Sequence, residues 1–264
     1  MRAPRARPCA VLLASGARNQ MAYMVPFLSR SLFLVVILYV FQALWRTVYA
    51  GRDALAGFSL TQMVWYLSVT EGVMLGRSSL WMTVQEEVKD GTLAYGLIRP
   101  MSYPAMTVFR FVGEGLVRVL PVLAMGALVA LASTGPLPRL AAALPALLVL
   151  AAGALVIGAL LEMLIGLAAF WMEEVAPLFW IVQKFIFILG GMFFPLDLFP
   201  SGFARVLKAL PFAFVTYWPG CVAVSGGHGF LRALGGQALW AALLSLCIAL
   251  AYRRAVKALQ AQGG

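Results

Sequence analysis

The chain has 264 residues, of which 62% are hydrophobic and 11% are charged. Soluble domains usually carry about a quarter charged residues, so this composition excludes an ordinary soluble protein and indicates an integral membrane protein. The formal net charge is +10, but the basic residues are scattered rather than gathered in one stripe, which argues against nucleic-acid binding and is typical of loops that face anionic lipid.

A basic leader occupies residues 1–23, before the first long apolar stretch. Its apolar centre, residues 9–14, is shorter than the roughly 7 to 15 residues of a signal-peptide core. We therefore expect the leader to lie in the cytoplasm or at the membrane interface. Two alternatives stay open, which are an overlong start with the true beginning at Met21 or Met24, and a cleaved signal.

Six stretches approach the roughly 20 apolar residues that a membrane helix needs. In chain order they are residues 25–45, 58–75, 116–132, 140–170, 177–194 and 231–251. They predict an all-α polytopic membrane protein whose six-helix domain covers residues 24–252, followed by a short basic tail over 253–264. An even number of spans places both termini on the same side of the membrane.

The orientation follows from the excess of Lys and Arg that cytoplasmic loops carry. Basic residues occur before the first stretch, after the second and after the last: Arg2, Arg5, Arg7, Arg18, Lys89, Arg99, Arg110, Arg253, Arg254 and Lys257. This distribution favours cytoplasmic termini. The opposite side is not free of basic residues, since it would hold Arg46, Arg52, Arg139, Arg205, Lys208 and Arg232.

A charged connection, "WMTVQEEVKDGTLAYGLIRPMSYPAM", follows the second stretch. It begins with the densest charge cluster of the chain, Glu86, Glu87, Lys89 and Asp90, and turns at Gly91. Thr92 is a plausible N-cap for a short helix that ends at Ile98. That helix would expose Leu93, Leu97 and Ile98. Such an apolar knob fits docking into a partner's groove, and the alternative is an ordinary solvated loop.

Ionisable groups inside the predicted spans are costly and usually face a bundle interior, a cavity or a partner. Arg110, Glu114 and Arg118 are four residues apart, so they lie on one helix face and can neutralise one another. We expect this stripe to be structural rather than to contact a substrate.

Three further charges lie deeper in the predicted spans. Glu162 shares an i+4 row with small residues, where another helix can approach closely, and either a packed or a cavity-facing role is open. Glu71 adjoins Gly72 and Gly76, whose G-x-x-x-G spacing is a weak signal for a seam with a second chain. Lys184 could reach the carboxylates at 173–174, Glu71 or Glu162.

The stretch "GGMFFPLDLFPSGFARVLKALPF", residues 190–212, interrupts the apolar pattern. Pro195 and Pro200 end the fifth predicted helix, because proline cannot continue its hydrogen-bond ladder. An amphipathic pattern follows, with Phe203, Val206, Leu207 and Leu210 on one face and Arg205 and Lys208 on the other. The piece is too short to cross a bilayer, so we expect it to lie in the outer interface or to re-enter partway before Pro211 breaks it.

Asp197 is the lone carboxylate of this stretch. It could cap the following turn, pair with Arg205 or Lys208, or meet a substrate.

Catalytic and nucleotide motifs give no support for an enzyme. Ser225 and His228 lie close together, but no G-x-S-x-G motif or useful carboxylate accompanies them. The sequence "LGGQ" at 234–237 looks like part of an ATPase signature, yet it begins an apolar stretch and the chain has no phosphate-binding loop. The three cysteines have no metal-like spacing, so we expect no metal site.

The six spans, the "EEVKDGTLAYGLIRPMSYP" connection and "GGMFFPLDLFP" followed by "LPF" and "YWP" resemble the permease subunits of type 2 ATP-binding cassette exporters. The closest resemblance is to the bacterial branch with separately encoded permeases that is associated with drug or viologen export. It implies a coupling helix that contacts the ATPase, with the residues Glu86, Glu87, Lys89, Asp90, Gly91, Thr92, Leu93, Leu97, Ile98 and Arg99. It also implies an extracellular gate formed by Pro195, Asp197, Pro200, Phe203, Leu207 and Pro211.

The same resemblance implies partners and a location. Two copies of a separate ATPase would bind ATP and Mg, so this chain would hold no cofactor of its own. A second permease chain, identical or a sister chain, would complete a path through the bacterial inner membrane. Candidate path residues are Glu71, Glu114, Arg118, Glu162 and Lys184.

Three other functions compete with this interpretation, and one of them is a non-transporting scaffold for an assembly. An ion-coupled secondary transporter could use Glu71, Glu162 and Lys184 as ion ligands, but the two halves show no clear inverted repeat of broken helices. An intramembrane enzyme would depend on Ser225 and His228 alone.

Overall fold

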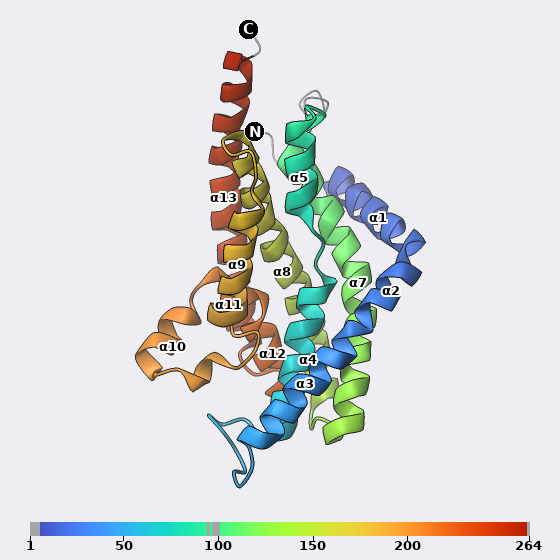
Figure 1. Ribbon diagram of the computed structural model, residues 1–264, viewed down its shortest axis with the longest axis vertical. Helices are drawn as coiled ribbons and strands as arrows, with labels where there is room; N and C mark the ends of the chain where they lie inside the picture. The colour runs from blue at the N-terminus through green and yellow to red at the C-terminus, as the bar shows by residue number, and fades with distance from the viewer. Residues whose placement is uncertain (1–5, 94–95, 97–100, 263–264) are drawn as a thin grey trace.

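The computed structural model describes residues 6–93, 96 and 101–262, which form a bundle of helices (Figure 1). The first half contains α1 (Ala6–Ala22), α2 (Met24–Ser31), α3 (Phe33–Val48), α4 (Leu60–Gly76), α5 (Leu80–Lys89) and α7 (Tyr103–Thr134). The second half contains α8 (Leu140–Leu167), η1 (Ala168–Phe170), α9 (Ala176–Leu189), η2 (Leu196–Leu198), α10 (Ser201–Leu207), α11 (Pro211–Val215), α12 (Tyr217–Val224) and α13 (Phe230–Gln262).

Four segments of the described chain are long and apolar enough to cross a membrane, which confirms a polytopic membrane protein. They are Met24–Val48, Tyr103–Thr134, Leu140–Phe170 and Phe230–Lys257. The second and fifth predicted spans correspond to α4 and α9, which have 17 and 14 residues and are shorter than a full span. The predicted number of six spans is therefore not established by helix length.

Two helices continue past the ends of the predicted spans. The third predicted span begins at 116, whereas α7 begins at Tyr103, where Pro104 occupies an early helical position that suits proline. The predicted basic tail over 253–264 is the continuation of α13, which has 33 residues and reaches Gln262. Pro104 is tolerated because it lies at the start of α7, and residues 253–262 contain no Pro or Gly.

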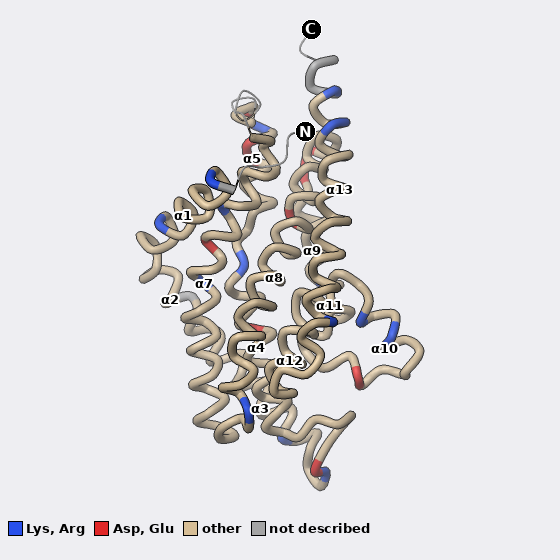
Figure 2. The backbone as a smooth tube through the Cα atoms, turned by 180° about the vertical axis from the view of Figure 1, so that it is seen from behind, with Lys and Arg blue, Asp and Glu red and all other residues tan. Residues whose placement is uncertain are grey.

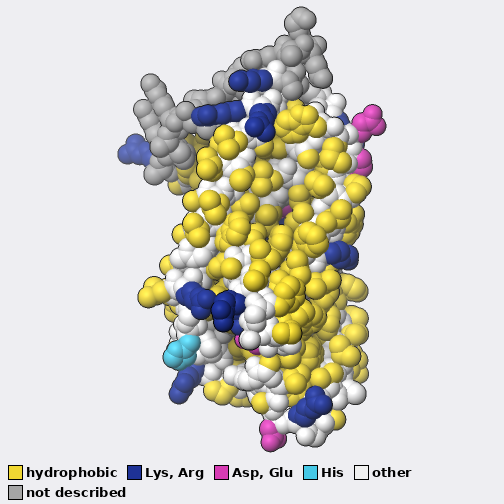
Figure 3. Space-filling model, turned by 90° about the vertical axis from the view of Figure 1, so that its left-hand side faces the viewer, with side chains coloured by type: hydrophobic (Ala, Val, Ile, Leu, Met, Phe, Trp, Pro, Cys, Tyr) yellow, Lys and Arg dark blue, Asp and Glu magenta, His cyan; other side chains and the backbone are white. Residues whose placement is uncertain are grey.

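The beginning of α1, the end of α5 and the end of α13 lie at one end of the molecule, called the upper end here (Figure 1). The connection between α3 and α4 lies at the opposite, lower end (Figure 1). Lys and Arg occur on α1, near the end of α13 and again on α10 (Figure 2). Between the upper and lower basic groups, one face presents a broad hydrophobic surface (Figure 3), as expected for a bundle that contacts lipid tails.

The centre of the bundle is α4, which is buried over nearly its whole length. Ser59 and Gln62 form a capping box at its start, since each side chain accepts a hydrogen bond from the other residue's backbone N–H. Gly72 and Gly76 face α7 of the same chain, where an added Cβ would lie 2.8 and 2.9 Å from Leu123 and Val119. The G-x-x-x-G motif thus serves packing within the chain, and its interpretation as a seam between chains is wrong.

The outer segment after α9 divides into an exposed part and a buried part. Helix α10 projects from the side of the bundle (Figure 1), with Phe203 and Val206 exposed and Leu207 buried. By contrast, α11 and α12 are buried at most positions and pack against α8 and α4. The part of the chain that re-enters the bundle is therefore 211–224, which follows the predicted amphipathic piece.

Candidate functional site

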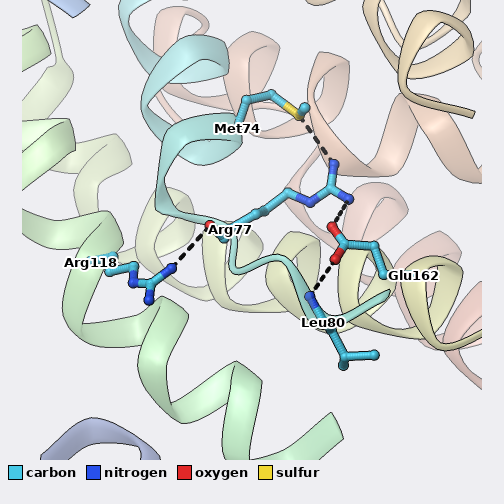
Figure 4. A network of polar contacts seen from close by, with 5 residues as sticks. All are labelled: Met74, Arg77, Leu80, Arg118 and Glu162. Atoms are coloured by element: carbon cyan, nitrogen blue, oxygen red, sulfur yellow. Dashed lines mark hydrogen bonds and ion pairs between the residues drawn. The ribbon is translucent and has the colours of Figure 1, made fainter. Parts of the chain in front are cut away.

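The candidate site begins where the chain leaves α4 and starts α5. Arg77 has an extended backbone there, with φ −70° and ψ 153°, so the helix is interrupted. Glu162 of α8 bridges the break (Figure 4). Its Oε1 accepts a hydrogen bond from Arg77 Nη2 at 2.7 Å, and its Oε2 accepts one from the backbone N of Leu80 at 2.8 Å. One carboxylate thus satisfies both a cation and the first N–H of α5, which has no partner within the helix.

This ion pair is buried, because the side chains of Arg77 and Glu162 are only 9% and 4% exposed. The row of small residues on α8 makes the close approach possible. A Cβ on Gly158 would lie 2.7 Å from Arg77 Nε, and one on Gly166 would lie 2.6 Å from Val84 of α5. The close approach predicted beside Glu162 is confirmed, and its partner is the α4–α5 segment.

A second group of charges continues the network towards α1. Arg118 Nη2 lies 3.6 Å from Glu114 Oε2, and Arg118 Nη1 donates to the backbone O of Arg77 at 3.5 Å (Figure 4 shows the latter contact). From α1, Gln20 accepts from Arg118 Nε at 2.6 Å, and Asn19 donates to Glu114 at 3.4 Å. The network therefore connects α8, the α4–α5 break, α7 and α1.

Sequence reasoning predicted only part of this second group. The pairing of Glu114 with Arg118 agrees with the i+4 spacing. Arg110 takes no part in an ion pair within the described ranges, and its guanidinium lies over the Phe111 ring at 5.0 Å. The contribution of α1 was missed, although the signal exists, since Gly16 and Gly113 allow the two helices to cross closely. A Cβ on Gly16 would lie 2.0 Å from the backbone O of Arg110.

The charged connection at the upper end extends α5 and then turns. Gly91 has a φ of +74°, a conformation that glycine adopts readily. Asp90 accepts hydrogen bonds from the Thr92 hydroxyl at 2.6 Å and from the Thr92 backbone N at 2.9 Å, and these bonds lower the pKa of Asp90. Asp90, rather than Thr92, therefore supplies the side-chain acceptor at this turn.

Two further features of this connection bear on its predicted role. Leu93 is only 2% exposed and belongs to the hydrophobic core, so its predicted exposure is wrong. Leu97, Ile98 and Arg99 lie outside the described residues. Exposed charges remain, because Glu86, Lys89 and Asp90 are on the surface and Lys89 Nζ lies 3.3 Å from Glu174 of the loop before α9. Glu87 instead accepts a hydrogen bond from Tyr103.

The segment between α9 and α12 has its own polar cluster, which is centred on Asp197. Asp197 Oδ1 pairs with Lys208 Nζ at 2.6 Å, and Oδ2 accepts from the Tyr217 hydroxyl at 2.8 Å. Arg205 is exposed and takes no part in these contacts. Trp218 of α12 donates from Nε1 to the backbone O of Lys208 at 3.0 Å. These bonds attach the exposed α10 to the buried α12.

The three prolines of the predicted gate lie at the starts of short helices. Pro195 immediately precedes η2, Pro200 immediately precedes α10, and Pro211 is the first residue of α11. These positions suit proline because the first N–H groups of a helix have no partner within it.

Glu71 and Lys184 stay outside these networks. Within the described ranges neither forms an ion pair, since Glu162 pairs with Arg77 and Glu174 with Lys89. Glu71 is 2% exposed, whereas Lys184 is exposed and its Nζ lies 5.2 Å from the centre of the Phe187 ring. The pairings suggested for Lys184 from the sequence are therefore not formed in this structure.

The chain is similar to a known family over most of its length. The model of a family described as "ABC-2 family transporter protein" matches residues 33–263, which is nearly the whole described chain from α3 onwards. No curated protein matches the chain significantly. A search for metal sites among the described side chains finds no cluster of three or more His, Cys, Asp or Glu residues.

Proposed function

The chain belongs to the ABC-2 family of transporter proteins, and from this we propose that it is the permease subunit of an ATP-binding cassette exporter whose ATPase is a separate chain. The family match over residues 33–263 carries the proposal. As a member of this family the chain is a membrane transport subunit. The export direction, the separate ATPase in two copies, the second permease chain and the bacterial inner membrane are parts of the proposal.

The two short helices, α4 and α9, are compatible with six membrane crossings and cytoplasmic termini. At about 1.5 Å per residue, the 17 residues of α4 cover about 26 Å of a hydrocarbon core about 30 Å thick. Helix α9 covers about 21 Å and is followed by the apolar segment 190–196, which adds length beyond the helix. The upper end, where α1 begins and α13 ends, is then cytoplasmic, in agreement with its Lys and Arg residues.

Coupling to the ATPase would take place at the upper end of α5. The exposed charges Glu86, Lys89 and Asp90 lie there, at the entrance to the connection that resembles a coupling helix. Movement of this connection would move α5, and the bond from Leu80 to Glu162 would carry that movement into α8. ATP drives the cycle only insofar as the ATPase binds the two permease states with different affinity.

An ion-coupled secondary transporter is the alternative that one observation favours. Glu71 is a buried carboxylate without an ion pair among the described residues, as an ion ligand would be. The other candidate ligand, Glu162, is occupied by Arg77. Transport into vesicles separates the two functions, because an uncoupler stops an ion-coupled carrier, whereas a mutated phosphate-binding lysine in the ATPase stops an exporter driven by ATP.

The coupling proposal is tested by reversing exposed charges. Since Leu93 is buried, aspartate there would damage folding, so Glu86→Arg with Asp90→Arg is the better variant. We expect this variant to insert into the membrane and to lose co-purification with the proposed ATPase subunit. Asp53→Arg, an exposed change at the lower end, is the matched control and should retain the ATPase. An intact complex with the double variant would show that the coupling residues are misassigned.

A further inference from the structure

Helix α9 presents an apolar face to its surroundings with one lysine at its centre. The exposed side chains of this face are Trp180, Ile181, Phe185 and Ile188. With 3.6 residues per turn, Lys184 falls in the middle of them. Helix α9 lies at the periphery of the bundle, in front of α8 in Figure 1, and Lys184 is exposed.

The position of Lys184 along α9 does not suit contact with lipid tails. At about 1.5 Å per residue it lies about 12 Å along the helix from Ala176. Its ammonium lies 5.2 Å from the centre of the ring of Phe187, which is about one turn further along the helix. A charge at such a depth usually faces a water-filled path or an opposite charge.

No carboxylate of the described chain neutralises this lysine. Glu162 is paired with Arg77, Glu174 with Lys89, and Asp197 with Lys208. The ammonium is thus available to an anion from outside the chain.

A cluster of phenyl rings adjoins the ammonium. Phe187 packs against Phe193 with ring centres 5.2 Å apart, and Phe193 stacks on Phe41 of α3 with ring centres 5.3 Å apart. All three rings are partly exposed. The cluster joins α9 to α3 and places an apolar, aromatic surface beside the only charge on this face of α9.

We propose that Lys184 and the phenyl cluster of Phe41, Phe187 and Phe193 bind the transported molecule, and that this molecule is an amphiphile with an anionic group. The inference depends on the proposed function as a transporter and adds its substrate class. A carboxylate, sulfonate or phosphate would meet the ammonium, and an acyl or aromatic body would cover the rings. The same ammonium repels cations, so a cationic substrate such as a viologen does not fit this site.

Photolabelling tests the proposal on the purified complex of this chain with its ATPase, in phosphatidylcholine nanodiscs. The probes are a palmitate that carries a diazirine and the matching diazirine-bearing alcohol, which has no charge. We expect the acid to label the segment 180–193 more strongly than the alcohol. In Lys184→Gln, labelling by the acid should fall on the order of tenfold, the scale expected when a hydrogen bond to a charged group is lost, and Lys184→Arg should retain it.

Two controls separate the specific site from general effects. Arg205→Gln removes an exposed cation from α10 and should leave labelling unchanged. Phe193→Ala should reduce labelling by both probes, because it removes the apolar surface that they share. Trapping the complex with ATP and vanadate should lower labelling by the acid, since a transported molecule leaves its site during the cycle.

Equal labelling by acid and alcohol, or unchanged labelling in Lys184→Gln, would overturn the proposal. Labelling that vanadate trapping does not change, in a complex that hydrolyses ATP, would identify a resident anionic lipid and would also overturn it. If no ATPase co-purifies with the chain, the proposed function fails instead. Labelling of this chain by itself then reports separately on the anion site.

Discussion

Replacing Glu162 by Gln removes the charge that neutralises Arg77 while the size of the side chain stays the same. The amide oxygen can still accept the hydrogen bond from Leu80 N, so the main loss is the counter-charge of a guanidinium that is 9% exposed. Breaking a buried ion pair on one side costs about 3–5 kcal/mol. Glu174→Gln is the matched control, because the Lys89–Glu174 pair is about half exposed and such pairs contribute about 0–1 kcal/mol.

Thermal denaturation in detergent, followed by the loss of the monodisperse species in size-exclusion chromatography, measures the difference. For a chain of this size, 1 kcal/mol corresponds to about 2–4 °C, so Glu162→Gln should lower Tm by roughly 6–20 °C. Glu174→Gln should lower it by about 4 °C or less. Adding Arg77→Leu to Glu162→Gln removes the unpaired charge and should restore most of the loss.

The stabilising role of the Arg77–Glu162 pair is refuted if the Tm of Glu162→Gln lies within about 2 °C of the wild type. It is also refuted if adding Arg77→Leu lowers the Tm of the Gln variant further. Either result would mean that water or lipid headgroups reach Arg77 and that the pair does not hold the α4–α5 break.

Two further predictions concern packing. Gly16→Ala places a methyl group 2.0 Å from the backbone O of Arg110, so α1 should separate from α7 and trypsin should cleave the leader several-fold faster, whereas Gly235→Ala, which has open space, should leave the cleavage rate unchanged. Gln237→Leu removes the donor to two buried backbone carbonyls and should cost about 1–3 kcal/mol, read as a lower Tm. Gln183→Leu should cost less, because Oε1 lacks a partner in both glutamines and only Gln237 donates the two hydrogen bonds from Nε2 that the change to Leu removes. Equal effects within either pair would contradict the packing described.

Hydropathy predicted the long apolar helices well, because their apolar character is a property of the residues alone. The stretch 140–170 coincides with Leu140–Phe170, and 231–251 lies inside α13. Helix ends were less predictable, since the start of α7 at Tyr103 depends on how residues 103–115 pack rather than on their mean hydropathy.

The candidate site was predicted as separate residues. Glu162 was expected among small residues, and Asp197 was expected to cap a turn, to pair with Arg205 or Lys208, or to meet a substrate. Which partner each takes depends on distance in space. Arg77 and Glu162 are 85 residues apart in sequence and 2.7 Å apart in the structure. The prediction for Leu93 was wrong. A leucine in a charged loop is expected to be exposed when the core that covers it is unknown, whereas Leu93 is buried.

The sequence by itself determined that this protein is a helical membrane protein with a small number of intramembrane charges, because the cost of placing polar groups in lipid restricts which residues can occur there. Only the tertiary structure decided how those charges are satisfied. A buried charge must find its partner wherever folding brings one, so Glu162 neutralises Arg77 at a helix break, α1 supplies Gln20 to Arg118, and Lys184 is left available to an anion from outside the described chain.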